Sequence, residues 1–322
     1  MNLYPLKFNP ILKERLWGGT KLKDVLGKPI ENDITGESWE LSAVEGDVSV
    51  VSNGDLSGTS LQELINKYPE ELLGKSVVER FGKEFPILIK FIDAKQDLSI
   101  QLHPNDELAK KRHNSFGKTE MWYVMDADKG AELIVGFNKD VTKEEYAKSI
   151  AEDTLLDLLN YESVKEGDTF FINTGKMHAI GAGVLLAEIQ QTSDITYRVF
   201  DFNRKDKNGN LRELHTDLAL DALDYTKKAD FKVKYSDKKD SVNNMVSCPY
   251  FNTNILELTK DLELDVEKRD SFTIYMCVGG KATISNEFGS VTIKKGETTL
   301  VPAQSKKINI ITTSAKLLEV TI

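Results

Sequence analysis

Two stretches of this sequence share one pattern: Val164-Lys-Glu-Gly-Asp-Thr-Phe-Phe-Ile-Asn-Thr-Gly-Lys-Met-His178 and Ile293-Lys-Lys-Gly-Glu-Thr-Thr-Leu-Val-Pro-Ala-Gln-Ser-Lys-Lys307. Each has a β-branched residue, two charged residues, Gly, an acidic residue and Thr, followed by an apolar run and a turn. A short apolar run that ends in turn residues is typical of a β-strand. Two such segments can look alike by chance, but their repetition favours an internal duplication.

The shared pattern Gly-(Asp/Glu)-x-x-x-(Val/Ile)-(Pro/Asn) resembles the second motif of cupin barrels, in which a His after the turn binds a metal ion. That position is His178 in the first copy and Lys307 in the second, and residues 240–322 contain no histidine. The resemblance implies a mainly β protein made of two cupin-type jelly-roll β-barrels. We expect a catalytic domain with a metal site at residues 1–235 and a metal-free cupin-like domain at residues 236–322.

Helical signals are few. The capping box Ser60-Leu-Gln-Glu63 predicts a helix over residues 61–68, and residues 105–112 have the pattern of a second short helix. Another capping box, Thr142-Lys-Glu-Glu145, predicts a helical insertion in the first domain over about residues 140–160. The remaining chain consists of short apolar runs separated by Gly, Asn and Asp, which is typical of β structure.

Composition narrows the class of protein. The 322 residues are 40% hydrophobic and 29% charged, which fits a soluble globular protein. A net charge of −9 argues against nucleic acid or an anionic membrane as a partner. No apolar run approaches the ~20 residues that span a bilayer, and the N-terminus lacks a signal-peptide pattern, so we expect a cytoplasmic protein. Cys248 and Cys277 lack the spacing of a metal pair and are expected to be buried thiols.

Gln101 and His103 are the first candidate metal ligands. They lie in Leu98-Ser-Ile-Gln-Leu-His103, whose alternation predicts a strand, and Pro104 ends that strand. Residues i and i+2 of a strand point to the same face, so both side chains would lie together. A metal-binding edge and an ordinary histidine at a strand end explain this spacing equally well.

Glu120 extends the set. It begins an aromatic, β-branched strand, so its carboxylate can face a barrel interior, although taken alone it would be interpreted as a solvated edge residue. Four candidate ligands then come from successive strands: Gln101, His103, Glu120 and His178. Imidazole and carboxylate suit Zn²⁺, with Mn²⁺, Fe²⁺ or Co²⁺ as substitutes. A weakly binding Gln oxygen favours a site whose shell is completed by substrate.

The segment after His178 carries further polar groups. Glu188, Gln190 and Asp194 alternate along a predicted strand, and Arg198 follows in an apolar setting. Arg198 is either the structural partner of an acid such as Asp194 or a fixed positive charge for an anionic intermediate. Local sequence favours the structural role.

Five motifs, in this order, resemble the type I mannose-6-phosphate isomerases, and more narrowly their short bacterial form without the extra helical domain. The resemblance covers about residues 1–230. The motifs are Phe85-Pro-Ile-Leu-Ile-Lys90, Ser99-Ile-Gln-Leu-His-Pro104, Lys118-Thr-Glu-Met-Trp122, Gly175-Lys-Met-His-Ala-Ile-Gly181 and Glu188-Ile-Gln-Gln-Thr-Ser-Asp-Ile-Thr-Tyr-Arg198.

This resemblance implies an enzyme that interconverts mannose 6-phosphate and fructose 6-phosphate with one Zn²⁺ per chain. The family's zinc ligands correspond to Gln101, His103, Glu120 and His178. Its active-site arginine corresponds to Arg198. The family's Lys-Pro-Glu is Lys118-Thr-Glu120 here, a departure at the middle residue only. Ser99 and Lys90 become candidate phosphate contacts, and Trp17 a candidate pocket residue, although such residues also have ordinary structural roles.

The reaction would move a proton between C1 and C2 of the sugar through a cis-enediolate. A divalent metal ion and Arg198 would stabilise its negative charge, and a base must carry the proton. Glu188, Lys118 and Asp194 are candidates, and neither the residues nor the resemblance chooses among them.

Two other functions fit part of the pattern. One is a different metal-dependent cupin, either an enzyme that acts on a sugar phosphate or an oxygenase. A fourth ligand from Gln101 disfavours the open iron site of an oxygenase. The other is a non-catalytic sugar-binding cupin, which would have no need of Arg198 beside four ligands. His113 is expected to face solvent and His215 to make a local hydrogen bond. A monomer and a homodimer remain equally open.

Overall fold

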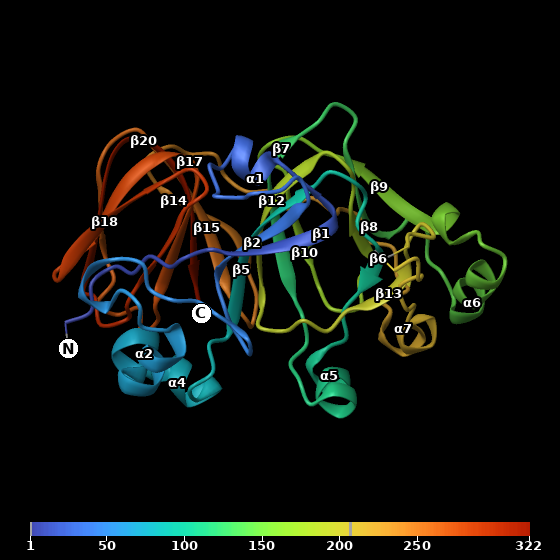
Figure 1. Cartoon of the computed structure of the whole chain (residues 1–322), viewed down its shortest axis with the longest axis horizontal. Coiled ribbons are helices and arrows are strands. Elements are labelled where there is room, and N and C mark those ends of the chain that lie inside the picture. Colours follow the sequence, from blue (N-terminus) through green and yellow to red (C-terminus); the bar gives the residue numbers. More distant parts are fainter. Residues whose placement is uncertain (1, 206–207) are drawn as a thin grey trace.

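The chain, described by a computed structural model for residues 2–205 and 208–322, forms two β-sandwiches that lie side by side (Figure 1). The N-terminal sandwich contains a six-stranded and a five-stranded sheet, and the C-terminal one is a single seven-stranded sheet folded on itself. Both have the jelly-roll character expected from the sequence, although their sheets are not closed barrels. Among the described residues, no helix has the length and apolar character needed to cross a membrane.

The six-stranded sheet has the order β1-β2-β5-β12-β7-β10. Alternate residues of its central strands enter two different hydrophobic clusters, which explains why β5 and β12 are buried along their whole length. A strand covered on both faces has a continuous apolar run rather than alternation. The strands are β1 (Ile11–Gly19), β2 (Thr35–Leu41), β5 (Ile87–Ala94), β7 (Glu120–Ala127), β10 (Thr169–Ile172) and β12 (Val184–Gln191).

The five-stranded sheet faces it with the order β13-β6-β11-β8-β9. Its strands are β6 (Ile100–Leu102), β8 (Glu132–Phe137), β9 (Leu159–Ser163), β11 (His178–Ile180) and β13 (Tyr197–Phe200). Only the short segment 164–168 joins β9 to β10, so these two edge strands lie on the same side of the sandwich. The opposite edges, β1 and β13, therefore flank the other side.

The C-terminal sheet is built around two long strands, β17 and β20, which pair with each other and with every other strand except β14. A two-stranded ribbon, β3 with β4, belongs to the N-terminal half. The strands are β3 (Ala43–Val44), β4 (Asp47–Val48), β14 (Val242–Ser247), β15 (Asn252–Leu258), β16 (Leu262–Asp265), β17 (Thr273–Asn286), β18 (Gly289–Lys294), β19 (Thr298–Val301) and β20 (Lys307–Thr321).

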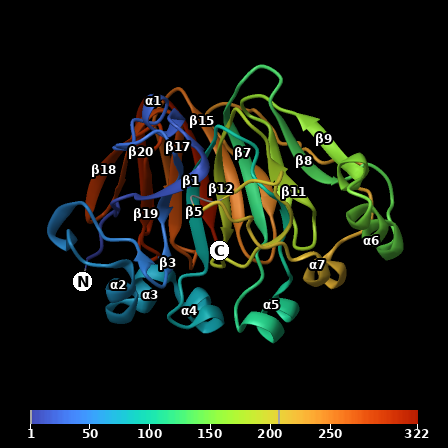
Figure 2. The ribbon, with the colours of Figure 1, turned by 45° about the vertical axis from the view of Figure 1, so that its right-hand side comes forward.

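Helices α2–α5 and α7 lie along one end of the two sandwiches (Figure 2). The α-helices are α1 (Lys21–Asp24), α2 (Leu61–Lys67), α3 (Pro69–Leu73), α4 (Lys75–Phe81), α5 (Asp106–His113), α6 (Lys143–Ala151) and α7 (Thr216–Ala222), and the 3₁₀ helices are η1 (Gly54–Leu56) and η2 (Leu155–Leu158). Both predicted capping boxes are present, at Ser60 and Thr142, and α5 is confirmed. Helices α1, α3, α4 and α7 were not predicted. Pro69, directly after α2, occupies the first turn of α3, where its missing N–H costs nothing.

The two copies of the repeated pattern have the same structure. Residues 169–172 form β10 and the equivalent residues 298–301 form β19. The glycine before each strand has a positive φ, 91° at Gly167 and 86° at Gly296. After each turn the next strand begins at the aligned position, His178 in the first copy and Lys307 in the second. The equivalence supports the predicted duplication.

Candidate active site

Three side chains form a row on the inner face of the five-stranded sheet. Gln101 pairs with His178 on one neighbouring strand and with Arg198 on the other. Residues directly opposite each other in antiparallel strands project from the same face. The pairing therefore brings together residues from β6, β11 and β13 that are far apart in the sequence.

A second polar row lies on the facing sheet. Lys90 pairs with Trp39 of β2 and with Glu188 of β12, which in turn pairs with Trp122 of β7. One step along, Glu120 of β7 pairs with Gln190 of β12. The space between the sheets at this level is consequently polar, whereas the next level along the strands, with Ile92, Val124 and Leu186, is apolar.

His103, Glu120 and His178 form the one group of His, Cys, Asp or Glu side chains in the described part of the chain that could hold a metal ion. Nε2 of His178 lies 3.4 Å from Oε1 of Glu120, and Nε2 of His103 lies 3.5 Å from Oε2. Ligand bonds of about 2.0–2.1 Å in a tetrahedron separate neighbouring ligand atoms by about 3.3 Å. The observed spacings fit that geometry.

Both histidines are oriented by the backbone. Nδ1 of His103 donates to the carbonyl of Ile195, and Nδ1 of His178 donates to the carbonyl of Lys176, each at 2.8 Å. This tautomer leaves the Nε2 lone pair of each ring facing Glu120. Burial lowers the pKa of His103 well below its usual value and that of His178 to about 3, so both rings are neutral, as metal binding requires.

Glu120 is the least satisfied group of the site. Both of its carboxylate oxygens are buried, and neither has a hydrogen-bond partner. Burial raises its pKa to about 7, with the positive charge of Lys118 acting in the other direction. The Lys118 ammonium lies 3.3 Å from Oε2 as an ion pair. This ion pair engages Oε2 alone, and a buried carboxylate so incompletely paired is costly unless a further cation binds it, so the residues present fit a metal ion.

Gln101 completes the predicted ligand set. Its amide nitrogen lies 3.5 Å from Nε2 of His178, and its oxygen is 3.4 Å from the Ser99 hydroxyl. Nitrogen and oxygen of an amide are interchangeable by a rotation of the side chain. The amide oxygen can therefore face the same point as the two histidines and Glu120.

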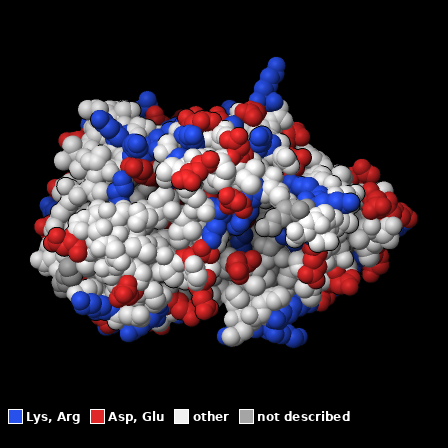
Figure 3. Space-filling model, viewed as in Figure 1, with Lys and Arg blue, Asp and Glu red and all other residues white. Residues whose placement is uncertain are grey.

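A narrow cavity adjoins this group. It has a volume of about 40 Å³, and its polar lining residues are Glu37, Lys90, Ser99, Gln101, Lys118, His178 and Glu188. Because small-molecule sites usually measure roughly 300–1,000 Å³, wall side chains must move before a ligand of ordinary size can enter. A neighbouring hollow of about 270 Å³ shares Ala179 and Ile180 with the cavity. On the face of the molecule seen in Figure 1, the space-filling view of Figure 3 shows Lys and Arg side chains inside a hollow near the middle.

Glu188 is fixed from two sides. Lys90 donates to Oε1 at 3.1 Å, and the indole N–H of Trp122 donates to Oε2 at 2.8 Å. Burial acts to raise its pKa, but the charges of Lys90 and Lys118 outweigh burial and the pKa falls below its usual value. Burial likewise acts to lower the pKa of Lys118, yet Glu120 and Glu188 raise it. Glu188 is thus ionised and Lys118 protonated at neutral pH.

The remaining predicted site residues lie outside the cavity lining. Trp17 packs in the hydrophobic cluster next to the cavity. Asp194 is exposed and lines a separate groove with Phe116, so the structure does not bring it to the metal group. Arg198 is partly buried on the edge strand β13, where its guanidinium donates to the carbonyl of Glu213 at 3.0 Å.

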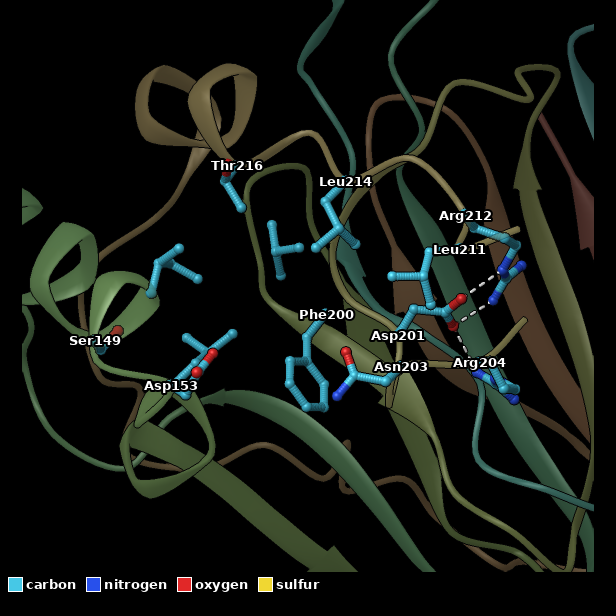
Figure 4. A pocket seen from close by; sticks show the side chains of 13 residues that line it. Ser149, Asp153, Phe200, Asp201, Asn203, Arg204, Leu211, Arg212, Leu214 and Thr216 are labelled. Carbon is cyan, nitrogen blue, oxygen red and sulfur yellow. Dashed lines mark hydrogen bonds and ion pairs between the residues drawn. The ribbon is translucent and has the colours of Figure 1, made fainter. Parts of the chain in front are cut away.

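Arg198 belongs to an arginine cluster at the edge of β13. Burial lowers the pKa of Arg198, and the charges of Arg212 and Arg204 act in the same direction, while Asp201 acts to raise it. Asp201 binds Arg204 at 2.7 Å and Nε of Arg212 at 2.6 Å. Figure 4 shows this pair of arginines converging on Asp201 at the side of a pocket of about 430 Å³.

Glu37 lines the cavity and was not predicted. It lies on β2 in Thr35-Gly-Glu-Ser-Trp-Glu-Leu41, where Glu37 and Trp39 share a face. The available signal was its spacing: Glu37 lies two residues before Trp39 and four before Leu41, which places its carboxylate on the apolar face of the strand. The two other histidines lie as predicted: His113 is exposed, and His215 accepts a hydrogen bond from the Arg198 N–H at 3.1 Å.

Comparison with known proteins matches both halves of the chain. Residues 5–143 match the family model of the phosphomannose isomerase type I catalytic domain, and residues 241–321 match that of the mannose-6-phosphate isomerase cupin domain. Mannose-6-phosphate isomerase ManA of Bacillus subtilis is 38% identical over 94% of each chain. Mannose-6-phosphate isomerase of Streptococcus mutans is 35% identical over 92% of each chain.

The fold is also found in a solved structure. The crystal structure of the mannose 6-phosphate isomerase from Bacillus subtilis superposes with a TM-score of 0.89 and 32% sequence identity. The match covers 99% of this chain and 100% of the other. Because the match covers nearly all of both chains, the similarity extends over both sandwiches and not over the N-terminal one alone.

Proposed function

This chain belongs to the type I phosphomannose isomerase family, and on that premise we propose that it interconverts mannose 6-phosphate and fructose 6-phosphate with one bound Zn²⁺. The observation that carries the proposal is the Glu120 carboxylate, which is buried without a hydrogen-bond donor and faces two neutral imidazoles. The proposed zinc ligands are Gln101, His103, Glu120 and His178.

Isomerisation moves a proton between C1 and C2 while negative charge spreads over O1 and O2 in a cis-enediolate. Zn²⁺, when bound, supplies the positive charge that stabilises these oxygens. Lys118 adds a second charge, because its ammonium borders both the cavity and Glu120. Arg198 adds a third from the open edge of the sandwich, in the same row as Gln101 and His178.

We assign the proton transfer to Glu188 among the candidate bases. Its carboxylate lines the cavity and is ionised, whereas Lys118 holds its proton at neutral pH and is better suited to donate a hydrogen bond. Asp194 is the weakest candidate because it is exposed in a separate groove. Lys90 and Ser99 stay candidates for the phosphate or for sugar hydroxyls, since both line the cavity.

The test is an isomerisation assay on protein stripped of metal and reloaded with one equivalent of Zn²⁺. Mannose 6-phosphate and fructose 6-phosphate are supplied separately, with and without a chelator. We expect turnover in both directions that is lost with the chelator and restored by Zn²⁺. Absence of turnover in the zinc-loaded protein would overturn the proposed function, and equal turnover in stripped protein would overturn the metal's role.

A further inference from the structure

Glu37 brings a carboxylate to the cavity that the proposed chemistry does not use. It lies on β2, next to Lys90 and Ile92 of β5, and its side chain is 12% exposed. Among described residues, Glu37 and Glu188 are the two acidic side chains lining the cavity. A carboxylate at this depth is rare without a defined set of partners.

The two oxygens of Glu37 have different surroundings. Oε2 accepts both available donors, Arg15 at 2.9 Å and the indole N–H of Trp39 at 2.8 Å. No hydrogen bond to Oε1 is found in the described part of the chain. Glu188 differs, because Lys90 and Trp122 bind one oxygen each. Oε1 of Glu37 is thus an acceptor held in place but unused.

The charge of Glu37 is maintained by its neighbours. Burial acts to raise its pKa, but Lys90 and Arg15 outweigh burial and lower the pKa below its usual value. Lys90 itself hydrogen bonds to Glu188 and to Gln190. The wall formed by β2 therefore carries a permanent negative charge, which suits hydroxyl groups and repels a phosphate.

We propose that Oε1 of Glu37 accepts a hydrogen bond from a hydroxyl group on the sugar carbon chain, between the reacting carbons and the phosphate. Glu37 is then a specificity-determining residue that recognises the sugar hydroxyls and keeps the phosphate away from the β2 wall. The inference rests on the proposed function, since it takes the ligand to be a hexose phosphate. The chemistry fits a hydroxyl because an ionised carboxylate is an acceptor only.

Glu37→Gln should change the hydrogen bonding at Oε1 alone, because Oε2 is already bound by two donors. Arg15 and Trp39 are both donors and will retain the single amide oxygen of the glutamine. Its NH₂ group then takes the position of Oε1, so an acceptor becomes a donor without a change of shape. Glu37→Asp keeps the charge but withdraws it from the cavity, and serves if the first variant folds poorly. Glu31→Gln, at an exposed position before β2, is the matched control.

The binding test uses mannitol 6-phosphate, which has the hydroxyls and the phosphate but no carbonyl to isomerise. Calorimetric titration of zinc-loaded protein should give a dissociation constant about 10- to 100-fold higher for Glu37→Gln than for wild type, as expected when a hydrogen bond to a charged group is lost. Glu31→Gln should bind as wild type. A change of less than threefold for Glu37→Gln in folded protein would overturn the inference.

Kinetics separate this role from a structural or catalytic one. A contact made equally in the ground state and transition state raises KM and leaves kcat nearly unchanged. We expect that split for Glu37→Gln with mannose 6-phosphate. A fall in kcat with unchanged KM would overturn the inference. Wild-type turnover is scored independently, so an inactive wild type that still binds mannitol 6-phosphate through Glu37 would refute the proposed function and not this contact.

Discussion

At the scale of single residues, the site depends on groups whose partners come from the backbone. The carbonyls of Ile195 and Lys176 set the tautomers of His103 and His178, and β pairing aligns Gln101 between two neighbours. Such partners are invisible in the sequence, which shows only residue types and spacing. They decide whether a histidine on a strand is a ligand or a surface residue.

His178→Ala should remove most of the bound metal. Loss of one imidazole leaves the Glu120 carboxylate with fewer partners for the cation, and we expect at least about a tenfold loss of zinc affinity. Metal analysis after dialysis against a weak chelator measures it. His113→Ala, at an exposed histidine, is the control and should retain wild-type zinc. Full zinc occupancy in His178→Ala would rule out this ligand.

Arg198→Ala should lower kcat about 100-fold with zinc still bound. Removing one preorganised positive charge from a developing oxyanion typically costs a factor of about 10²–10³. Arg198→Lys should recover part of the loss, whereas Arg80→Ala removes an exposed arginine bonded to the Pro249 carbonyl and should have no effect. The measurement is steady-state kinetics on protein whose zinc content has been determined. Near-normal turnover of Arg198→Ala would assign this arginine a structural role.

The sequence could predict the grouping of His103, Glu120 and His178 because its ordered motifs resemble those of a known family, whereas the strand spacing of Gln101 and His103 alone left the question open. It missed Glu37, although the spacing from Trp39 places both side chains on one face of β2, because only the packing of β2 beside β5 shows that this face lines a cavity. It could not separate Asp194 from Glu188 either. Both alternate along one segment, but β12 ends at Gln191 and the chain then turns outward.

At the scale of elements, the repeated turn is the most predictable part of the fold. Its glycines, Gly167 and Gly296, share a conformation that other residues rarely adopt. The space around them differs. A Cβ at Gly296 would lie 2.7 Å from Cβ of Leu26 and 2.8 Å from its carbonyl oxygen, whereas one at Gly167 would meet only the Tyr235 hydroxyl at 3.5 Å.

Gly296→Ala should therefore destabilise the protein more than Gly167→Ala. Backbone strain should cost about 1–2 kcal/mol at either position. At Gly296 the overlap with Leu26 adds to it, for a total of roughly 3 kcal/mol or more. Denaturant unfolding of both variants gives the difference. Equal losses would mean that the surroundings of Gly296 relax freely and that only the shared φ matters.

The segment after β13 should depend on Asp201 in a pH-dependent way. Burial acts to raise the pKa of Asp201, but hydrogen bonds from Arg212 and Arg204 outweigh it and lower the pKa below 3.8. Its stabilising effect is then present above the unfolded-state pKa and is lost as pH falls through the folded-state pKa. We expect Asp201→Asn to cost about 1–3 kcal/mol at pH 7.

Urea unfolding between pH 7 and pH 3 tests this. The difference in the free energy of unfolding between wild type and Asp201→Asn should be constant down to about pH 4. It should shrink below that pH as the wild-type carboxyl takes up a proton. Glu213→Gln, at an exposed carboxylate nearby, should change stability little at any pH. A difference that grows on acidification would contradict the assigned direction of the pKa shift.

At the scale of the whole molecule, the two sandwiches share one hydrophobic cluster. Phe85 of the first half stacks on Phe272 of the second with ring centroids 5.1 Å apart. Leu6 near the N-terminus pairs with Leu300 of β19, and the Ala303 N–H donates to the Leu72 carbonyl at the end of α3. The second half thus supports the wall formed by β5 and β12, the strands that carry Lys90 and Glu188.

This shared cluster predicts cooperative unfolding of both halves. All three tryptophans, Trp17, Trp39 and Trp122, lie in the first half, so their fluorescence reports that half alone. Phe272→Ala removes a fully buried ring from the second half and should cost about 3–5 kcal/mol. We expect the tryptophan transition to move to lower denaturant together with far-ultraviolet circular dichroism. Ile311→Ala, at an exposed position of β20, should leave both signals in place. If circular dichroism moved while the tryptophan transition stayed, the halves would unfold independently, and the second sandwich would not support the catalytic one.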